Sequence, residues 1–219
     1  PLTSSYGQPI KFAASVDGSG PTFPTGYVSY YEGAKLLATA QIGQDGVAVV
    51  NIASLGIGSR SVVAKYGGSA SYAPGQSEGL AVTVAKVAPI PGIFTSVNPA
   101  RAGEEVTIGV TMSPPWSGTP TGDVTFYDGA DELGTRALEG GKASITTSSL
   151  VVGPHSLTAR YAGDDRYLPI STGQATLSVN AASQTLTALT AAKPSVYYGQ
   201  EASFSIKVTG DGGTPTGTV

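Results

Sequence analysis

The chain has 219 residues, a net charge of −3 at pH 7 and only 12% charged residues, about half the usual share of roughly 25%. No run of lysine or arginine offers a surface for nucleic acid, and no apolar run approaches the roughly 18 residues of a membrane-spanning segment. The lack of cysteine excludes disulfides, thiolate metal sites and cysteine nucleophiles, whereas 40% apolar residues with 30 glycines and 15 prolines favour a sandwich or barrel of short strands.

Short stretches of alternating apolar residues run along the chain, as expected for strands with one buried face. In the first third they lie at residues 10–16, 28–30, 48–52, 62–66 and 80–84. In the middle third they lie at residues 93–97, 106–112, 124–126, 143–145, 157–161 and 177–179, with Leu133 after a hairpin signal at Asp128-Gly129. No stretch has a helical period of useful length.

Five landmarks recur at a nearly constant offset, which is the strongest signal in the sequence. Tyr6-Gly7-Gln8 returns as Ala102-Gly103-Glu104 and as Tyr198-Gly199-Gln200, with 96 residues between successive glycines. The other landmarks are Pro24-Thr25-Gly26, Tyr31-Glu32-Gly33, Tyr66 and Tyr72, each repeated 95 or 96 residues later. This period exceeds the roughly 20–50 residues of a solenoid repeat and matches an autonomous domain.

The repeat and its strands predict an all-β chain of tandem immunoglobulin-like β-sandwiches, about seven strands each, joined by short linkers. We expect a module over residues 1–85 that lacks most of its first strand, a complete module over 86–180, and a truncated N-terminal part of a third module over 181–219. Prolines 89 and 91 predict a stiff first linker over residues 86–92, and the second linker, over 180–184, is short.

The first and last repeats are incomplete and Pro1 is a poor natural start, so we interpret the chain as a piece of a larger protein. One hypothesis is that the strand around residues 186–189 fills the open edge of a first module in a neighbouring molecule. The alternative is that the remainder of the third repeat lies outside the sequence.

Three motifs resemble the bacterial Ig-like domains of group 3. They are the Pro-Thr-Gly-x-Val run from residues 24 and 120, the Leu-x-x-Gly run from residues 55 and 150 that ends in Ala-x-Tyr, and the Gly-x-x-x-Tyr loops from residues 68 and 163. The resemblance covers the whole chain and implies structural modules, in tandem, in large exported or cell-surface bacterial proteins. The family often has Asp after the loop glycine; Asp164 fits this pattern and Ser69 does not.

The polar residues predict neither a catalytic site nor a metal site. His155 is the only histidine, its counterpart in the first repeat is Arg60, and no Gly-x-Ser-x-Gly motif accompanies it, so we interpret it as a residue at a strand end or rim. Calcium prefers six to eight oxygen ligands, and the candidate carboxylates for such a site are Asp128, Asp131, Glu132, Asp164 and Asp165. Because Asp131 corresponds to Lys35 and Asp164 to Ser69, this cluster does not repeat.

The one candidate for ligand binding is Trp116, in the loop Pro114-Pro115-Trp116-Ser117-Gly118. It could stack on a sugar or anchor a protein contact, or it could cover its own sandwich or the joint between modules. The repeated tyrosines, Tyr66, Tyr72, Tyr161 and Tyr167, and the pair Tyr197-Tyr198, are expected in the core and at corners, with hydroxyls bonded to loop backbone.

These features predict a non-catalytic structural spacer, extracellular or at the cell surface, without a cofactor. Its expected partners are the neighbouring modules of the same chain, with no nucleic acid. The alternative is an adhesin or binding module that uses inter-strand loops such as that of Trp116 to hold a surface glycan or protein.

Overall fold

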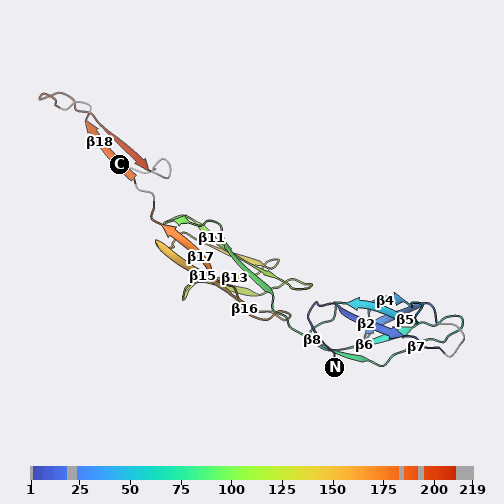
Figure 1. The fold of residues 1–219 in the computed structure, drawn as a ribbon. Coiled ribbons are helices and arrows are strands. Elements are labelled where there is room, and N and C mark those ends of the chain that lie inside the picture. The colour runs from blue at the N-terminus through green and yellow to red at the C-terminus, as the bar shows by residue number, and fades with distance from the viewer. Residues whose placement is uncertain (1, 19–23, 183–184, 192–194, 211–219) are drawn as a thin grey trace.

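The computed structural model describes residues 2–18, 24–182, 185–191 and 195–210, and within them every regular element is a β-strand. Two β-sandwiches and a two-stranded hairpin follow one another in chain order (Figure 1). The all-β immunoglobulin-like architecture predicted from the alternating apolar residues is therefore confirmed.

The first sandwich has a large sheet in the order β1-β8-β6-β3-β4, with β7 paired to β6, and a small sheet of β2 and β5. Its strands are β1 (Leu2–Ser5), β2 (Ile10–Ser15), β3 (Tyr27–Glu32), β4 (Lys35–Gln41), β5 (Val47–Ile52), β6 (Gly58–Tyr66), β7 (Gly75–Gln76) and β8 (Leu80–Ala85). The apolar side chains that alternate along β2, β3, β6 and β8 point between the two sheets and form one core.

The second sandwich repeats this topology and adds a strand to the small sheet, which has the order β14-β11-β9; the large sheet has the order β10-β17-β15-β12-β13, with β16 paired to β15. Its strands are β9 (Ile90–Thr95), β10 (Ala100–Arg101), β11 (Val106–Ser113), β12 (Asp123–Asp128), β13 (Asp131–Ala137), β14 (Lys142–Thr147), β15 (Gly153–Tyr161), β16 (Ile170–Ser171) and β17 (Ala175–Asn180). Its core includes Phe126, Leu157, Tyr161 and Tyr167, all fully buried.

A short strand at the start of each large sheet pairs in parallel with the last strand of its sandwich. Leu2–Ser5 form β1, which pairs in parallel with the last strand β8 as β10 pairs with β17. Residues 1–5 were expected to be too short for the first strand of their module, and β1 is the counterpart of β10 rather than of β9. Within the described residues, β2 therefore pairs with β5 alone, whereas β11 lies between β14 and β9.

The first linker is shorter than the prolines suggested. Pro91 and Gly92 belong to β9 and lie opposite Met112 and Thr111 of β11. A proline is tolerated there because β9 is the outer strand of its sheet, where a missing N–H breaks no pairing on the open side. Only residues 86–89 lie between the last strand of the first sandwich and the first strand of the second.

The described part of the third repeat is a hairpin of β18 (Thr185–Ala191) and β19 (Phe204–Gly210). Leu189 lies opposite Ile206, which is the pairing of Ile93 with Val110 moved 96 residues along the chain. Tyr197 and Tyr198, expected in a core or corner, are 84% and 108% exposed in the described part of the chain. Part of the predicted second linker, residues 183–184, lies outside the described residues.

Candidate functional site: the joint between the sandwiches

Tyr6 connects the two sandwiches. It follows β1, donates its backbone N–H to the carbonyl of Ala85 at 2.9 Å, and packs against the cores of both sandwiches. Its ring meets the ring of Tyr167 edge to face, with centroids 5.8 Å apart and an interplanar angle of 84°. The guanidinium of Arg166 lies 5.5 Å from the centroid of the same ring. Edge-to-face aromatic pairs of this kind add about 0.5–1.5 kcal/mol beyond the area they bury.

The linker is bonded directly to the loop between β15 and β16 of the second sandwich. Val87 forms a parallel bridge with Tyr167: it donates its N–H to the carbonyl of Arg166 at 3.3 Å and accepts the N–H of Leu168 at 3.0 Å. The ammonium of Lys86 donates to the backbone carbonyl of Asp164 at 2.6 Å. Main-chain bonds fix both the direction and the register of the linker, which side-chain packing alone would leave adjustable.

Asp164 holds the loop that receives the linker. Its Oδ1 accepts the N–H groups of Arg166 and Tyr167, both at 2.7 Å, and its Oδ2 accepts the N–H and the hydroxyl of Thr121, at 2.9 and 2.8 Å. Burial raises the pKa of Asp164, but these four hydrogen bonds lower it by more than burial raises it. The net pKa therefore lies below the ordinary carboxyl value. The carboxylate named as a calcium candidate is thus occupied by hydrogen bonds to its own sandwich.

The loop that carries Trp116 lies against the first sandwich. The hydroxyl of Ser117 donates to the carbonyl of Gly7 at 3.4 Å, and the carbonyl of Ser117 accepts the hydroxyl of Tyr167 at 3.1 Å. Gly7 has a φ of +77°, and a Cβ there would lie 2.8 Å from the carbonyl oxygen of Ser117, so the close approach requires glycine. Trp116 lies beside this contact and remains 49% exposed.

His155 lies away from the joint and is buried, with 7% of its surface exposed, rather than at a rim as expected. Its Nδ1 lies 2.5 Å from Oδ2 of Asp128 and its Nε2 lies 2.7 Å from the carbonyl oxygen of Val151. Both neighbours accept hydrogen bonds, so the protonated imidazole, in which both ring nitrogens donate, is the form that fits this site. Burial lowers the pKa of His155, whereas the hydrogen bonds and the charge of Asp128 raise it, and the net pKa is raised.

The same arrangement occurs in the first sandwich with other residue types. Arg60 binds Glu32 at 3.4 Å and donates to the carbonyl groups of Gly56 and Ile57. In both sandwiches a cationic side chain, on β6 or β15, therefore binds an acidic residue of a hairpin. The same side chain also donates to a backbone carbonyl four residues before itself in the sequence. The sequence contained this signal as the paired positions 32 and 60, and 128 and 155, but it was hidden because both members change identity.

Two of the repeated tyrosines, Tyr66 and Tyr161, donate their hydroxyls to loop backbone, as expected. The hydroxyl of Tyr66 donates to the carbonyl of Thr25 at 2.8 Å, and that of Tyr161 donates to the carbonyl of Thr121 at 2.6 Å. Tyr167 is fully buried, whereas its counterpart Tyr72 is only partly buried. Tyr6 of the first sandwich packs on the ring of Tyr167 and contributes to its burial.

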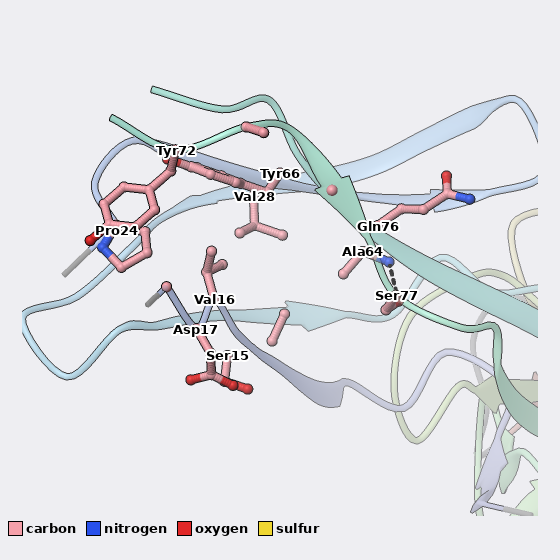
Figure 2. A pocket seen from close by; sticks show the side chains of 14 residues that line it. Ser15, Val16, Asp17, Pro24, Val28, Ala64, Tyr66, Tyr72, Gln76 and Ser77 are labelled. Carbon is pink, nitrogen blue, oxygen red and sulfur yellow. Dashed lines mark hydrogen bonds between the residues drawn. The ribbon is translucent and has the colours of Figure 1, made fainter. Parts of the chain in front are cut away.

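A cavity of about 400 Å³ opens at the end of the first sandwich that faces away from the joint (Figure 2). Figure 2 shows the ring of Tyr72 beside Pro24, with Val16 and Val28 on the walls below it. Ser77 accepts the backbone N–H of Ala64 at 3.0 Å and fixes the remaining wall. Asp17 is the one carboxylate among the described residues that line the cavity, and Ser15, Gln76 and Ser77 add further polar groups to the lining.

The other acidic candidates do not converge. Asp131, Glu132 and Asp165 are exposed, and Asp128 is engaged by His155 and by the N–H of Ser156. Among the described residues, no group of three or more His, Cys, Asp or Glu side chains is arranged to hold a metal ion. In the same part of the chain no helix is long and apolar enough to cross a membrane.

Two sandwiches with this strand order, joined end to end by a short hydrogen-bonded linker, define tandem immunoglobulin-like modules. The sequence matches the bacterial Ig-like domain (group 3) family over residues 1–85 and again over residues 94–180. The chain therefore belongs to that family, as the three sequence motifs indicated. No match was found among curated proteins.

Solved structures that match this chain have low sequence identity and low TM-scores. The fibronectin(III)-like modules of Clostridium thermocellum CbhA are 19% identical, with 82% of this chain and 90% of that chain covered and a TM-score of 0.31. The D0-D1 domain of intimin is 19% identical, with 80% and 93% covered and a TM-score of 0.32. The BSP domain of a biofilm associated protein is 18% identical, with 83% and 29% covered and a TM-score of 0.28. The family assignment thus rests on the sequence match.

Proposed function

We propose that the chain is a non-catalytic spacer whose modules are held in a defined order and orientation, in an extracellular or cell-surface bacterial protein. The observation that carries this proposal is the joint: Tyr6 belongs to both cores and the linker is hydrogen-bonded to the second sandwich. A flexible tether would need neither, and it would place no aromatic ring across the boundary. Membership in a family of bacterial Ig-like modules supports the surface location.

The polar groups of the described residues support a structural role. Asp164, Asp128 and His155 each have their hydrogen-bonding atoms engaged by loop backbone or by one another. A general base must instead be free to reach a proton of the substrate. These side chains stabilise loops that set the shape of each module.

Pulsed electron paramagnetic resonance tests the rigidity of the joint. The chain has no cysteine, so Lys35→Cys and Asp131→Cys place spin labels at exposed, repeat-equivalent positions of the two sandwiches. We expect a single narrow distance distribution, which Tyr6→Ala broadens and the exposed control Tyr27→Ala leaves unchanged. A broad distribution in the otherwise unaltered chain would refute a spacer with a rigid joint.

The exposed side chain of Trp116 favours a second candidate function, an adhesive contact with a glycan or a protein. Its loop is held by the bonds of Ser117, so the indole is presented at little cost in conformational entropy. Binding to a glycan or matrix-protein array should disappear in Trp116→Ala and persist in Val151→Ala, which removes another exposed apolar side chain. Equal signals from both variants would exclude Trp116 as the anchor.

A further inference from the structure

An aromatic ring lies on the outer face of the small sheet of the second sandwich. Phe94 of β9 is paired with Gly109 of β11, and it points away from the core against which its neighbour Ile93 packs. A Cβ added at Gly109 would lie 2.3, 2.7 and 2.8 Å from Cζ, Cε2 and Cε1 of Phe94, as expected when the ring lies flat over this position. Gly109 is therefore buried although it faces outward, whereas Phe94 is 54% exposed. One side of the ring covers the sheet and the other side faces solvent.

This arrangement does not repeat with the module. Gly109 corresponds to Ala13 in the first sandwich, and the pair of Phe94 with Gly109 corresponds to Thr190 with Ser205 in the hairpin. A glycine weakens a strand because it has no side chain to pack, and a ring from the next strand offsets that weakness. Alanine or serine removes the weakness more simply, so covering a glycine does not account for the open side of the ring.

Hydroxyl groups lie along one side of the ring. Ser144 of β14 is paired with Gly109, and Thr107 and Thr146 form the neighbouring row with their hydroxyl oxygens 3.2 Å apart. Rows on one face of a strand are separated by about 7 Å, so these hydroxyls are within reach of a molecule that sits on Phe94. Each hydroxyl both donates and accepts hydrogen bonds, which suits a ligand that is itself rich in hydroxyls.

The row on the other side of the ring is open above a further hydroxyl. Thr111 lies between Gly92 and Lys142. A Cβ at Gly92 would lie 2.7 Å from Oγ1 of Thr111, so the glycine keeps space over this hydroxyl. Lys142 is the one charged side chain among those that face outward from β9, β11 and β14, and no carboxylate is among them. The surface is thus polar but nearly uncharged.

We propose that this surface, the Phe94 platform, binds a neutral β-1,4-linked glycan chain. The platform consists of the ring of Phe94 and the hydroxyls of Thr107, Thr111, Ser144 and Thr146. One face of a pyranose ring is made of C–H groups, which carry partial positive charge and stack on the negative face of an aromatic ring. The hydroxyls at the edge of the same sugar then lie beside the serine and threonine hydroxyls. The proposal adds a binding surface to the spacer and does not depend on the rigidity of the joint.

The surroundings of the ring favour a glycan over a protein partner. The buried centre of a protein interface is depleted of serine and packs its aromatic anchors into dry pockets. Phe94 is instead flanked by hydroxyls, and the next exposed apolar side chain on its side of β9 is Ile90, four residues away. The outer face of three paired strands has no walls of its own, so it fits the extended ribbon of a β-1,4-linked chain better than a coiled α-1,4-linked one.

Titration of the whole chain with cellohexaose and with chitohexaose, followed by its amide NMR signals, tests the platform. At millimolar glycan we expect the signals of residues 107–111 and 144–146 to shift with at least one of these β-1,4-linked probes. The α-1,4-linked maltohexaose should leave them unchanged. Absence of shifts with both β-1,4-linked probes overturns the proposal, and equal shifts with maltohexaose overturn the preference for an extended chain.

Two variants change the ring in different ways. Phe94→Ala removes it, and Gly109→Ala keeps it but places a methyl group where the ring now lies. Each should weaken binding by about tenfold, the loss expected for one stacking contact, whereas Phe94→Tyr should bind like the wild type. The matched control is Tyr27→Ala, which removes an exposed ring from β3 of the first sandwich and should leave binding unchanged.

The signals of the buried core of the second sandwich show whether each variant is folded. A folded Phe94→Ala chain that binds as tightly as the wild type overturns the proposal; if that variant does not fold, unchanged binding in Gly109→Ala overturns it instead. Loss of binding in Trp116→Ala with full binding in Phe94→Ala assigns the glycan to the loop and also overturns the platform. None of these results alters the distance distribution expected across the joint, so the spacer and the platform fail independently.

Discussion

Asp164 is the residue on which the loop at the joint depends. One carboxylate accepts four hydrogen bonds there, three from backbone N–H groups and one from the hydroxyl of Thr121. Hydrogen bonds to a charged acceptor contribute about 1.5–3 kcal/mol each, although they do not add when they share one group.

Asp164→Ala should therefore lower the free energy of unfolding of the second sandwich by about 2–3 kcal/mol. The matched control is Ser69→Ala, which among the described residues removes one side-chain bond, from the N–H of Ser71 at 3.4 Å, and should cost well under half as much. Urea unfolding of the two variants measures both values. Equal losses would show that the four bonds do not stabilise the loop.

The lowered pKa of Asp164 also gives its contribution a direction with pH. The contribution is present above the ordinary carboxyl pKa and is lost as the pH falls through the lower pKa of the folded state. The free energies of unfolding of the wild type and of Asp164→Ala, measured along an acid titration, should therefore converge at low pH.

His155 predicts the opposite pH dependence in the same sandwich. Its folded pKa is raised, so its stabilisation is complete below the ordinary histidine pKa and is lost as the pH rises through the folded value. His155→Arg introduces the residue found at this position in the first sandwich and should remove this dependence, since arginine stays charged. Thermal melts at mildly acidic and mildly alkaline pH compare the two chains, and a pH dependence retained in the arginine variant would contradict the prediction.

At the scale of elements, the loops between the long strand and the next short strand require glycine at one position. Gly163 has a φ of +86°, and a Cβ there would lie 2.9 Å from the nitrogen of Pro169 and 3.0 Å from the carbonyl oxygen of Tyr167. Both neighbours are backbone atoms, so they cannot rotate away.

Gly163→Ala should destabilise the second sandwich by about 2–4 kcal/mol, from a left-handed conformation together with a backbone clash. Gly129→Ala is the control, because its φ is also positive, at +57°, but no atom lies within 4 Å of the added methyl group. We expect it to cost about 1 kcal/mol. Denaturant unfolding of both variants separates the clash from the conformational term, and equal costs would mean that the loop backbone moves aside.

The elements show what could be predicted from sequence and what could not. Alternation of apolar residues located the strands because each has one buried face. Pro91 was assigned to a linker because a proline usually ends a strand, and only the position of β9 at a sheet edge makes it acceptable. The contact of Tyr6 with Tyr167 carried no local signal, since its partners are far apart in sequence and meet only when two complete sandwiches stack.

The repeat also failed to predict the ion pair of His155 with Asp128. A comparison by residue identity found no repeated polar cluster, because histidine replaces arginine and aspartate replaces glutamate between the modules. A comparison by charge at equivalent positions would have found it.

For the whole molecule, the contacts of Tyr6 with both cores predict that the stabilities of the two sandwiches are coupled. Because Tyr6 packs against both cores, Tyr6→Ala should lower both transitions in calorimetry, by about 4–8 °C for each kcal/mol lost in a domain of this size. Tyr27→Ala, at an exposed position in β3, should shift neither. A shift confined to the first sandwich would mean that the ring contributes nothing across the boundary.

The parallel pairing of the terminal strands has a mechanical consequence. When a sandwich is stretched by its two ends, β1 and β8 are drawn in opposite directions along their common axis, so their hydrogen bonds are loaded together in shear instead of opening one after another. The first sandwich has four registered residue pairs in this position and the second has two between β10 and β17. Under tension these parallel pairs would resist separation together, and we expect the first sandwich, with its longer pair, to withstand more force than the second.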